Sequence, residues 1–209
     1  MGDFKKNSSS LIHNLSIGLL LITGILILNN PFDRAITLFG NSYVIDKLST
    51  LMKILTILGG AFVLSISTKY LKVAQIFLIE YPILILCSIL GMMVMISSND
   101  LMVFYIGLEL QSLALYVLAS FNRDQLKSSE SGLKYFVLSA LSSGLLLYGC
   151  SLIYGFSGST NFNIIGNSMD STHYGLTFGI VFILVGLAFK ISAVPFHMWA
   201  PDVYEGSPS

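Results

Sequence analysis

Apolar residues dominate six segments of the chain, and short polar stretches separate them. A helix needs roughly 20 mostly apolar residues to cross the hydrocarbon core of a membrane, and each segment comes close to that length. The pattern therefore predicts six spanning helices. Their expected bounds are 11–28, 48–68, 81–97, 101–120, 131–155 and 174–204. The last helix should be broken near Pro195, because a proline interrupts the hydrogen-bond ladder of a helix.

The composition supports a membrane protein and excludes other classes. Hydrophobic residues make up 54% of the chain and charged residues 11%, with a mean hydropathy of +0.79, whereas a soluble domain carries about 25% charged residues. We therefore expect an all-α membrane protein with one transmembrane domain over residues 1–209. Eleven basic and eleven acidic residues cancel, so nothing indicates a nucleic-acid partner. Cys87 and Cys150 lie singly in apolar runs, without metal-ligand spacing.

Basic residues in the short loops predict the orientation, because loops on the negative side of a membrane are enriched in Lys and Arg. The side that would carry the N-terminus has Lys5, Lys6, Lys69, Lys72, Arg123 and Lys127. The opposite side has only Arg34 and Lys47. We expect the N-terminus on the matrix side of a mitochondrion or the cytoplasmic side of a bacterium.

A carboxylate stands in the middle of the fourth apolar segment. Tyr105, Glu109, Ser112 and Tyr116 follow one another at helical spacing and therefore share one face. Such a polar stripe should face protein or water, because a charge in contact with lipid is costly. Glu109 is either a proton carrier with a lysine partner or a structural carboxylate bonded to a neighbouring helix. Tyr105, Ser112 and Tyr116 are candidate relay groups beside it.

Lys190 lies near the end of the last apolar segment, five residues before Pro195. A buried amine of this kind can give up and take back a proton, and a broken helix beside a buried charge is how transporters build ion sites. Gly175, Gly179 and Gly186 share a stripe with Lys190, and small residues let another helix approach closely. The stripe therefore predicts a packed groove that ends at the buried amine.

Two more lysines lie inside apolar segments. Lys134, in the first turns of the fifth segment, is the expected partner that sets the protonation of Glu109. The two residues should differ in depth by about 12 Å, so water could bridge them. Lys53 lies shallow in the second segment, and we expect it to extend its amine to the membrane interface.

The three histidines give weaker signals. His197 lies beside the expected break and could relay protons, although a structural hydrogen bond explains it equally well. His13 and His173 lie at membrane edges and should be solvated. The sequence has no glycine-rich nucleotide loop and no iron–sulfur cysteine set.

Three stretches resemble a known family. LELQSLALYVLAS (108–120), GLKYFVLSALSSGLLLYGCSLIYG (132–155) and FKISAVPFHMWAPDVYEGSP (189–208) resemble subunit 2 of the respiratory NADH dehydrogenase, complex I. The resemblance implies an antiporter-like, proton-translocating subunit in which Glu109, Lys134 and Lys190 match the family's charged residues. It also implies that this chain holds no cofactor and no metal. NADH, flavin, iron–sulfur clusters and ubiquinone would belong to other subunits of the complex.

Members of that family have about fourteen helices in two inverted repeats, and this chain resembles the second to the seventh. It would thus be the first half of an antiporter-like inverted-repeat fold. The resemblance leads us to expect other membrane-arm subunits and the lipid bilayer as partners. We also expect a second polypeptide that carries the C-terminal half and covers the glycine stripe. Residue usage typical of an AT-rich genome favours the mitochondrial inner membrane over a bacterial plasma membrane.

Two other functions fit the same residues. A cation/proton antiporter subunit of the Mrp type shares the pattern of charged helices, but the sequence motif MWAPDVYEGSP favours complex I. A purely structural remnant of the membrane arm would keep the helices without moving protons.

Overall fold

The computed structural model describes residues 2–29, 35–74, 76–168 and 174–208, with side chains from Ser9 onward. The expectations for Arg34 and His173, and for the side chains of Lys5 and Lys6, lie outside this part. The described elements are α1 (Gly2–Leu28), β1 (Ile36–Leu38), β2 (Tyr43–Ile45), α2 (Lys47–Val73), α3 (Glu80–Ile96), α4 (Leu101–Ala119), α5 (Leu126–Ser157), α6 (Phe162–Ser168), α7 (Tyr174–Lys190) and α8 (Ala200–Gly206).

The predicted all-α membrane fold is confirmed. By length and composition, α1 from Ser9, α2, α4 and α5 can each cross a membrane, and α3 and α7 are shorter apolar helices of 17 residues each. Large apolar side chains stay exposed on the outside of the bundle, including Leu19, Ile22, Phe62 and Ile66. Such a surface is abnormal in water, and in a bilayer it faces lipid.

Several helices extend beyond their apolar segments, because polar residues continue the helix where the chain leaves the hydrocarbon region. α2 runs to Val73, five residues past its expected end, and α5 begins at Leu126, five residues early. Aspartates set two of the starts. The side chain of Asp46 accepts a hydrogen bond from the backbone N–H of Ser49, which lowers the pKa of that carboxyl. The side chain of Asp100 caps α4 by accepting hydrogen bonds from the backbone N–H groups of Met102 and Val103.

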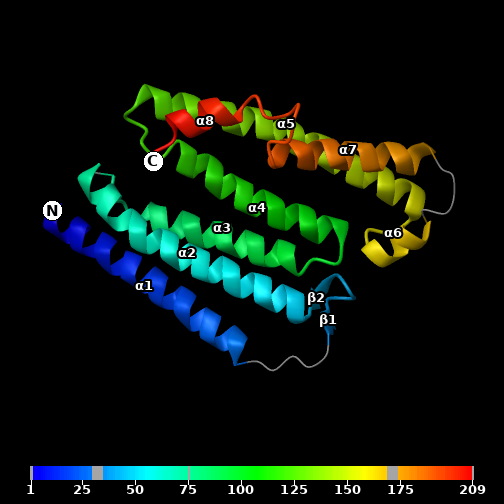
Figure 1. The fold of residues 1–209 in the computed structure, drawn as a ribbon, viewed down its shortest axis with the longest axis horizontal. Helices are drawn as coiled ribbons and strands as arrows, with labels where there is room; N and C mark the ends of the chain where they lie inside the picture. The colour runs from blue at the N-terminus through cyan, green and yellow to red at the C-terminus, as the bar shows by residue number, and fades with distance from the viewer. Residues whose placement is uncertain (1, 30–34, 75, 169–173, 209) are drawn as a thin grey trace.

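The helices form two packed groups that α4 connects (Figure 1). α1, α2 and α3 enclose one apolar cluster, which contains Leu20, Ile57, Leu64 and Ile89. α4, α5 and α7 enclose a second cluster around Leu146 and Cys150. α3 and α4 approach closely: a Cβ on Gly91 would lie 2.6 Å from the backbone nitrogen of Gln111. α4 is therefore held on both sides, which fixes the direction of its polar face.

The longest described helix, α5, supports both parts of the broken helix. Its 32 residues span about 48 Å at 1.5 Å per residue. α7 lies along its C-terminal half and α8 along its N-terminal half, with residues 191–199 between them (Figure 1). The predicted break near Pro195 is confirmed.

The glycine stripe of α7 packs against α5. A Cβ on Gly179 would lie 2.8 Å from the side chain of Ile153, and one on Gly186 would lie 2.7 Å from that of Leu146. The expected close helix contact is thus present. The expectation that a second polypeptide covers this stripe is wrong, because α5 of the same chain covers it.

Three short segments join at the end of the molecule away from α8. β1 and β2 form an antiparallel hairpin. The hydropathy pattern does not predict it, because its strands have only three residues each. The backbone of Val44 donates to the Ser97 carbonyl at 2.8 Å, and Leu101 donates to Thr160 at 2.8 Å. The hairpin, the α3–α4 turn and the loop before α6 thereby form one connected rim.

Candidate functional site

Lys190 is the last residue of α7, where the helix breaks. Its Nζ donates to the Tyr116 hydroxyl at 2.8 Å, to Ser112 Oγ at 3.2 Å and to Glu109 Oε1 at 3.2 Å. All three partners come from α4, and the lysine side chain is only 10% exposed. A buried ammonium needs such compensation, because an uncompensated charge inside a protein is costly.

The predicted polar face of α4 is present, with one exception. Glu109, Ser112 and Tyr116 all point to Lys190. Tyr105, one turn earlier, instead packs against the apolar cluster of α4, α5 and α7. Helical spacing alone placed all four residues on one stripe, but the amine reaches only the three nearest the end of α4.

Glu109 receives a second donor from another helix. The Ser143 hydroxyl of α5 donates to Glu109 Oε1, the oxygen that also accepts from Lys190. The neighbouring Ser142 donates to the Gly186 carbonyl at 3.0 Å and so joins α5 to α7. Neither serine is among the site residues that the sequence predicts. The sequence feature that could have indicated them is a pair of adjacent hydroxyl residues in an otherwise apolar helix, next in the chain to the helix that carries Glu109.

The expected pairing of Glu109 with Lys134 is wrong in this structure. Lys134 Nζ lies 2.8 Å from Asp202 Oδ2 and 2.9 Å from Glu130 Oε1, and its side chain is 41% exposed. It stands nine residues before Ser143, the α5 residue that touches Glu109. Nine residues correspond to about 13 Å and about two and a half turns, so Lys134 points away from the carboxylate.

A row of aromatic side chains connects the break with the hydrogen-bond partners of Lys190. The Tyr116 and Tyr135 rings meet edge to face, with centroids 4.7 Å apart, and Tyr135 stacks on Trp199 at 4.8 Å. Trp199 Nε1 donates to the Phe189 carbonyl at 3.2 Å. The row therefore ties the end of the broken segment back to the residue that precedes Lys190.

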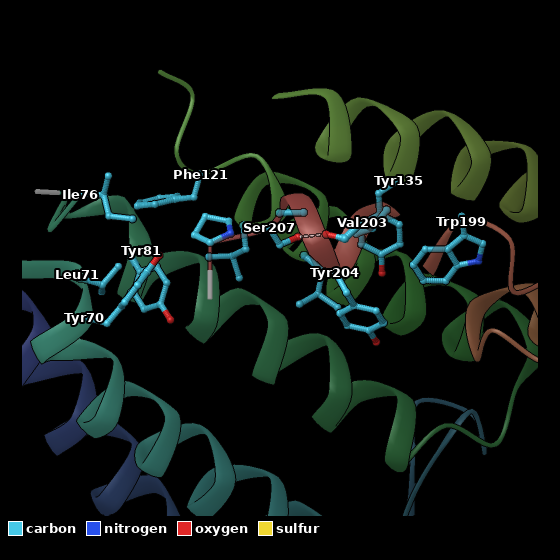
Figure 2. Close-up of a pocket in the computed structure, with 14 residues that line it drawn as sticks. Tyr70, Leu71, Ile76, Tyr81, Phe121, Tyr135, Trp199, Val203, Tyr204 and Ser207 are labelled. Atoms are coloured by element: carbon cyan, nitrogen blue, oxygen red, sulfur yellow. Dashed lines mark hydrogen bonds between the residues drawn. The ribbon is translucent and has the colours of Figure 1, made fainter. Parts of the chain in front are cut away.

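A cavity of about 330 Å³ opens beside this row and is lined mostly by apolar and aromatic side chains. Figure 2 shows Tyr135 and Trp199 near one end of it, with Tyr70 and Tyr81 near the other. Tyr135 lines the cavity and also touches Tyr116, a ligand of Lys190. One aromatic side chain thus stands between the cavity and the lysine's own ligands.

His197 lies in the break with an exposed side chain. Its carbonyl accepts a hydrogen bond from the Ala200 backbone at 3.1 Å, but within the described part its ring forms no hydrogen bond. Its role as a relay stays a prediction. In the same part, no group of three or more His, Cys, Asp or Glu side chains could hold a metal ion.

Lys53 and His13 are both more buried than the sequence predicts. Lys53 does extend toward the start of α2, but it is buried there and donates to the Tyr43 hydroxyl of the hairpin at 3.0 Å. His13 was expected to be solvated, and this is wrong: it is 1% exposed, with Nε2 2.9 Å from the Leu64 carbonyl oxygen. It binds α1 to α2, which a reading of hydropathy along one segment could not show.

Known proteins share this fold and sequence. The family described as "NADH:quinone oxidoreductase/Mrp antiporter, TM" matches residues 98–209, more than half of the chain. NADH-quinone oxidoreductase subunit N of Pelagibacter ubique (strain HTCC1062) is 84% identical over 209 residues, which are 100% of this chain and 44% of the relative. The protein of the same name from Bartonella bacilliformis is 55% identical over 95% of this chain and 41% of its own length.

A solved structure agrees with these relatives. A chain of the respiratory complex I from Thermus thermophilus with bound aureothin has a TM-score of 0.79 and 28% identity, over 95% of this chain and 43% of that chain. The present chain spans less than half the length of the relatives it matches. These relatives are bacterial, so the expected mitochondrial location finds no support among them. The resemblance to a complex I membrane subunit is confirmed, and the chain belongs to the NADH:quinone oxidoreductase/Mrp antiporter family.

Proposed function

We propose that the chain is part of a proton-translocating membrane subunit of an NADH:quinone oxidoreductase, in which Glu109 and Lys190 form the working pair. The observation that carries the proposal is the ion pair itself. Two opposite charges, 10% and 21% exposed, lie 3.2 Å apart between helices of an apolar bundle. Ionisable residues at such a depth mark ion or proton pathways.

The pair can move a proton by opening and closing. In the closed arrangement, the ammonium and the carboxylate compensate each other. When Lys190 moves away from α4, the Glu109 carboxylate is left inside the bundle without its positive partner, and an unpaired buried charge is costly. Lys190 is the last residue of α7, so a rearrangement of the break at residues 191–199 can carry its side chain away from α4.

Hydroxyl groups line the short path around the pair. Ser112, Ser143 and Tyr116 each contact Lys190 or Glu109, and a hydroxyl can both donate and accept a hydrogen bond. Tyr116 is the group nearest to the aromatic-lined cavity, through Tyr135. We propose this side as the entry of protons to Lys190, with His197 as a further candidate relay at the break.

The relatives are more than twice as long as this chain, and we propose that the remaining part of their fold packs on the outer face of α7. Exposed side chains there include Phe178, Val181 and Leu184. The expected second polypeptide stays a prediction. We propose that the chain assembles with other membrane-arm subunits. NADH, flavin, iron–sulfur clusters and ubiquinone would bind to other subunits of the complex. The chain would lie in a bacterial plasma membrane with its N-terminus in the cytoplasm.

The test separates proton transfer from electron transfer in the assembled complex. Glu109→Gln removes the titrating carboxylate, and Lys190→Arg keeps the charge but prevents proton release, because arginine stays protonated. In membrane vesicles, both variants should lower quinone-dependent proton pumping at least about tenfold, equivalent to about 1.4 kcal/mol. NADH oxidation by ferricyanide should persist, since no electron carrier is expected on this chain. Normal pumping in assembled complexes would contradict the proposal and support a structural role.

The Mrp-type antiporter remains a second candidate, because the matching family includes both kinds of protein. The subunit N relatives favour the oxidoreductase. A sodium gradient that drives proton movement through the purified chain and its partners, without NADH, would favour the antiporter.

A further inference from the structure

Five charged side chains join α5 to α8, away from the Glu109–Lys190 pair. Lys127 Nζ lies 3.1 Å from Glu205 Oε1, and Lys134 Nζ lies 2.8 Å from Asp202 Oδ2. Lys134 also pairs with Glu130 at 2.9 Å, one turn earlier on its own helix. We refer to this group as the charge clasp: Lys127, Glu130, Lys134, Asp202 and Glu205.

The spacing of the charge clasp, together with a close backbone contact at Gly206, favours one register of α8 on α5. Lys127 and Lys134 are seven residues apart and therefore share one face of α5, two turns from each other. Asp202 and Glu205 are three residues apart and share one face of α8. The pairs run antiparallel, and a Cβ on Gly206 would lie 2.7 Å from the Lys127 carbonyl oxygen. α8 can slide along α5 only by breaking both pairs.

The register of α8 in turn sets the position of the break. Trp199 directly precedes α8, stacks on Tyr135 and donates to the Phe189 carbonyl. Tyr135 directly follows Lys134 in the chain and contacts Tyr116, a ligand of Lys190. A shift of α8 therefore moves Trp199, and both the backbone before Lys190 and the tyrosine that binds its amine must respond.

We propose that Lys134 is a positioning residue: through the charge clasp it holds α8, and thereby the broken segment, so that Lys190 stays within reach of Glu109. This inference rests on the proposed function, because it assigns Lys134 a role in the same site. The role differs from that of a proton carrier. The Lys134 ammonium pairs with Glu130 and Asp202, and the lysine side chain faces away from Glu109.

The decisive comparison uses arginine at two lysine positions. Arginine keeps the positive charge and can bind two carboxylates, but it cannot release a proton at working pH. In the assembled complex, Lys134→Arg should retain most of the quinone-dependent proton pumping, whereas Lys190→Arg should lose it. Lys134→Gln and Asp202→Asn should each lower the ratio of pumped protons to electrons by up to about fivefold, because each removes one side of the pair that holds α8.

Controls separate this effect from general destabilisation. Arg123→Gln removes an exposed positive charge on the same side of the molecule that forms no ion pair within the described residues, and it should leave pumping unchanged. NADH oxidation by ferricyanide and the amount of assembled complex are measured for every variant. If Lys134→Gln fails to assemble, a charge exchange decides: Lys127→Glu should lower pumping, and adding Glu205→Lys should restore it.

Loss of pumping in assembled Lys134→Arg, to the level of Lys190→Arg, would overturn the positioning role and make Lys134 a proton carrier. Failure of the charge exchange to restore pumping would overturn it as well. If Lys190→Arg pumps normally, the proposed function fails instead, whatever the variants of the charge clasp show.

Discussion

At the residue scale, Glu109 stands where three helices meet. α4 carries it, α7 brings the ammonium of Lys190, and α5 brings the hydroxyl of Ser143. The oxygen that accepts from the lysine also accepts from the serine, so Ser143 limits the orientation of the Glu109 side chain. The serine therefore belongs to the site although it carries no charge.

Removing this hydroxyl gives a specific test. Ser143→Ala should lower proton pumping about tenfold or more, because a hydrogen bond to a charged group contributes about 1.5–3 kcal/mol. The control is Ser139→Ala, one turn away on α5, where the buried hydroxyl has no partner among the described residues. Pumping in the two variants is compared in vesicles, and equal effects would contradict a special role for Ser143.

The sequence predicts those contacts of the site that depend on a single helix, and it does not predict those that depend on how helices pack. Glu109, Ser112 and Tyr116 share a face because of helical spacing, which depends only on the helix that contains them. Which lysine reaches the carboxylate depends on how far α7 extends along α5, and no local rule fixes that. Chain order favours Lys134, which lies on the next helix, whereas the structure brings Lys190 from a helix further along the chain.

At the scale of elements, α5 and α7 touch through backbone. A Cβ on Gly149 would lie 2.8 Å from the Gly179 carbonyl oxygen, closer than real side chains approach a backbone atom. This contact holds Gly186 and Lys190 at their depth, because both lie further along the same helix. The hydropathy pattern predicts where the helices lie, and the glycine stripe predicts close packing. Neither of them identifies the partner helix or the short hairpin.

A matched pair of glycines on α5 tests the contact. Gly149→Ala should destabilise the complex by about 1–3 kcal/mol, because the added methyl group must push the two helices apart. Gly144→Ala adds the same group where nothing lies within 4 Å, and it should be neutral or slightly stabilising. Thermal unfolding of the complex in detergent measures both. Similar midpoints for the two variants would show that α5 and α7 are not in backbone contact.

At the scale of the whole molecule, the two ends of the helix bundle differ in their number of basic residues. The hairpin tip, where Phe39 is 83% exposed, lies at one end, and the α4–α5 turn with Arg123 lies at the other (Figure 1). Among the described residues, Lys69, Lys72 and Lys127 lie at the end with Arg123, whereas Lys47 and Lys53 lie at the hairpin end. This difference predicts that the end with Arg123 faces the cytoplasm.

Single cysteines can test this orientation in a background with Cys87→Ser. A membrane-impermeant maleimide should label Arg123→Cys from the cytoplasmic side only and Phe39→Cys from the opposite side only. Proton pumping of both variants is measured to show that they fold. Labelling of both positions from one side would contradict the arrangement of the helices across the membrane.

The unbroken α5 also has a consequence for how such chains change during evolution. Both ends of the segment 191–199 are attached to one rigid helix, at Gly186 on one side and at Asp202 on the other. The distance that the segment must bridge is therefore set by α5 and not by the segment itself. Selection acts on its length as much as on its chemistry, so insertions and deletions should accumulate elsewhere, in the loop before α7, and be absent here.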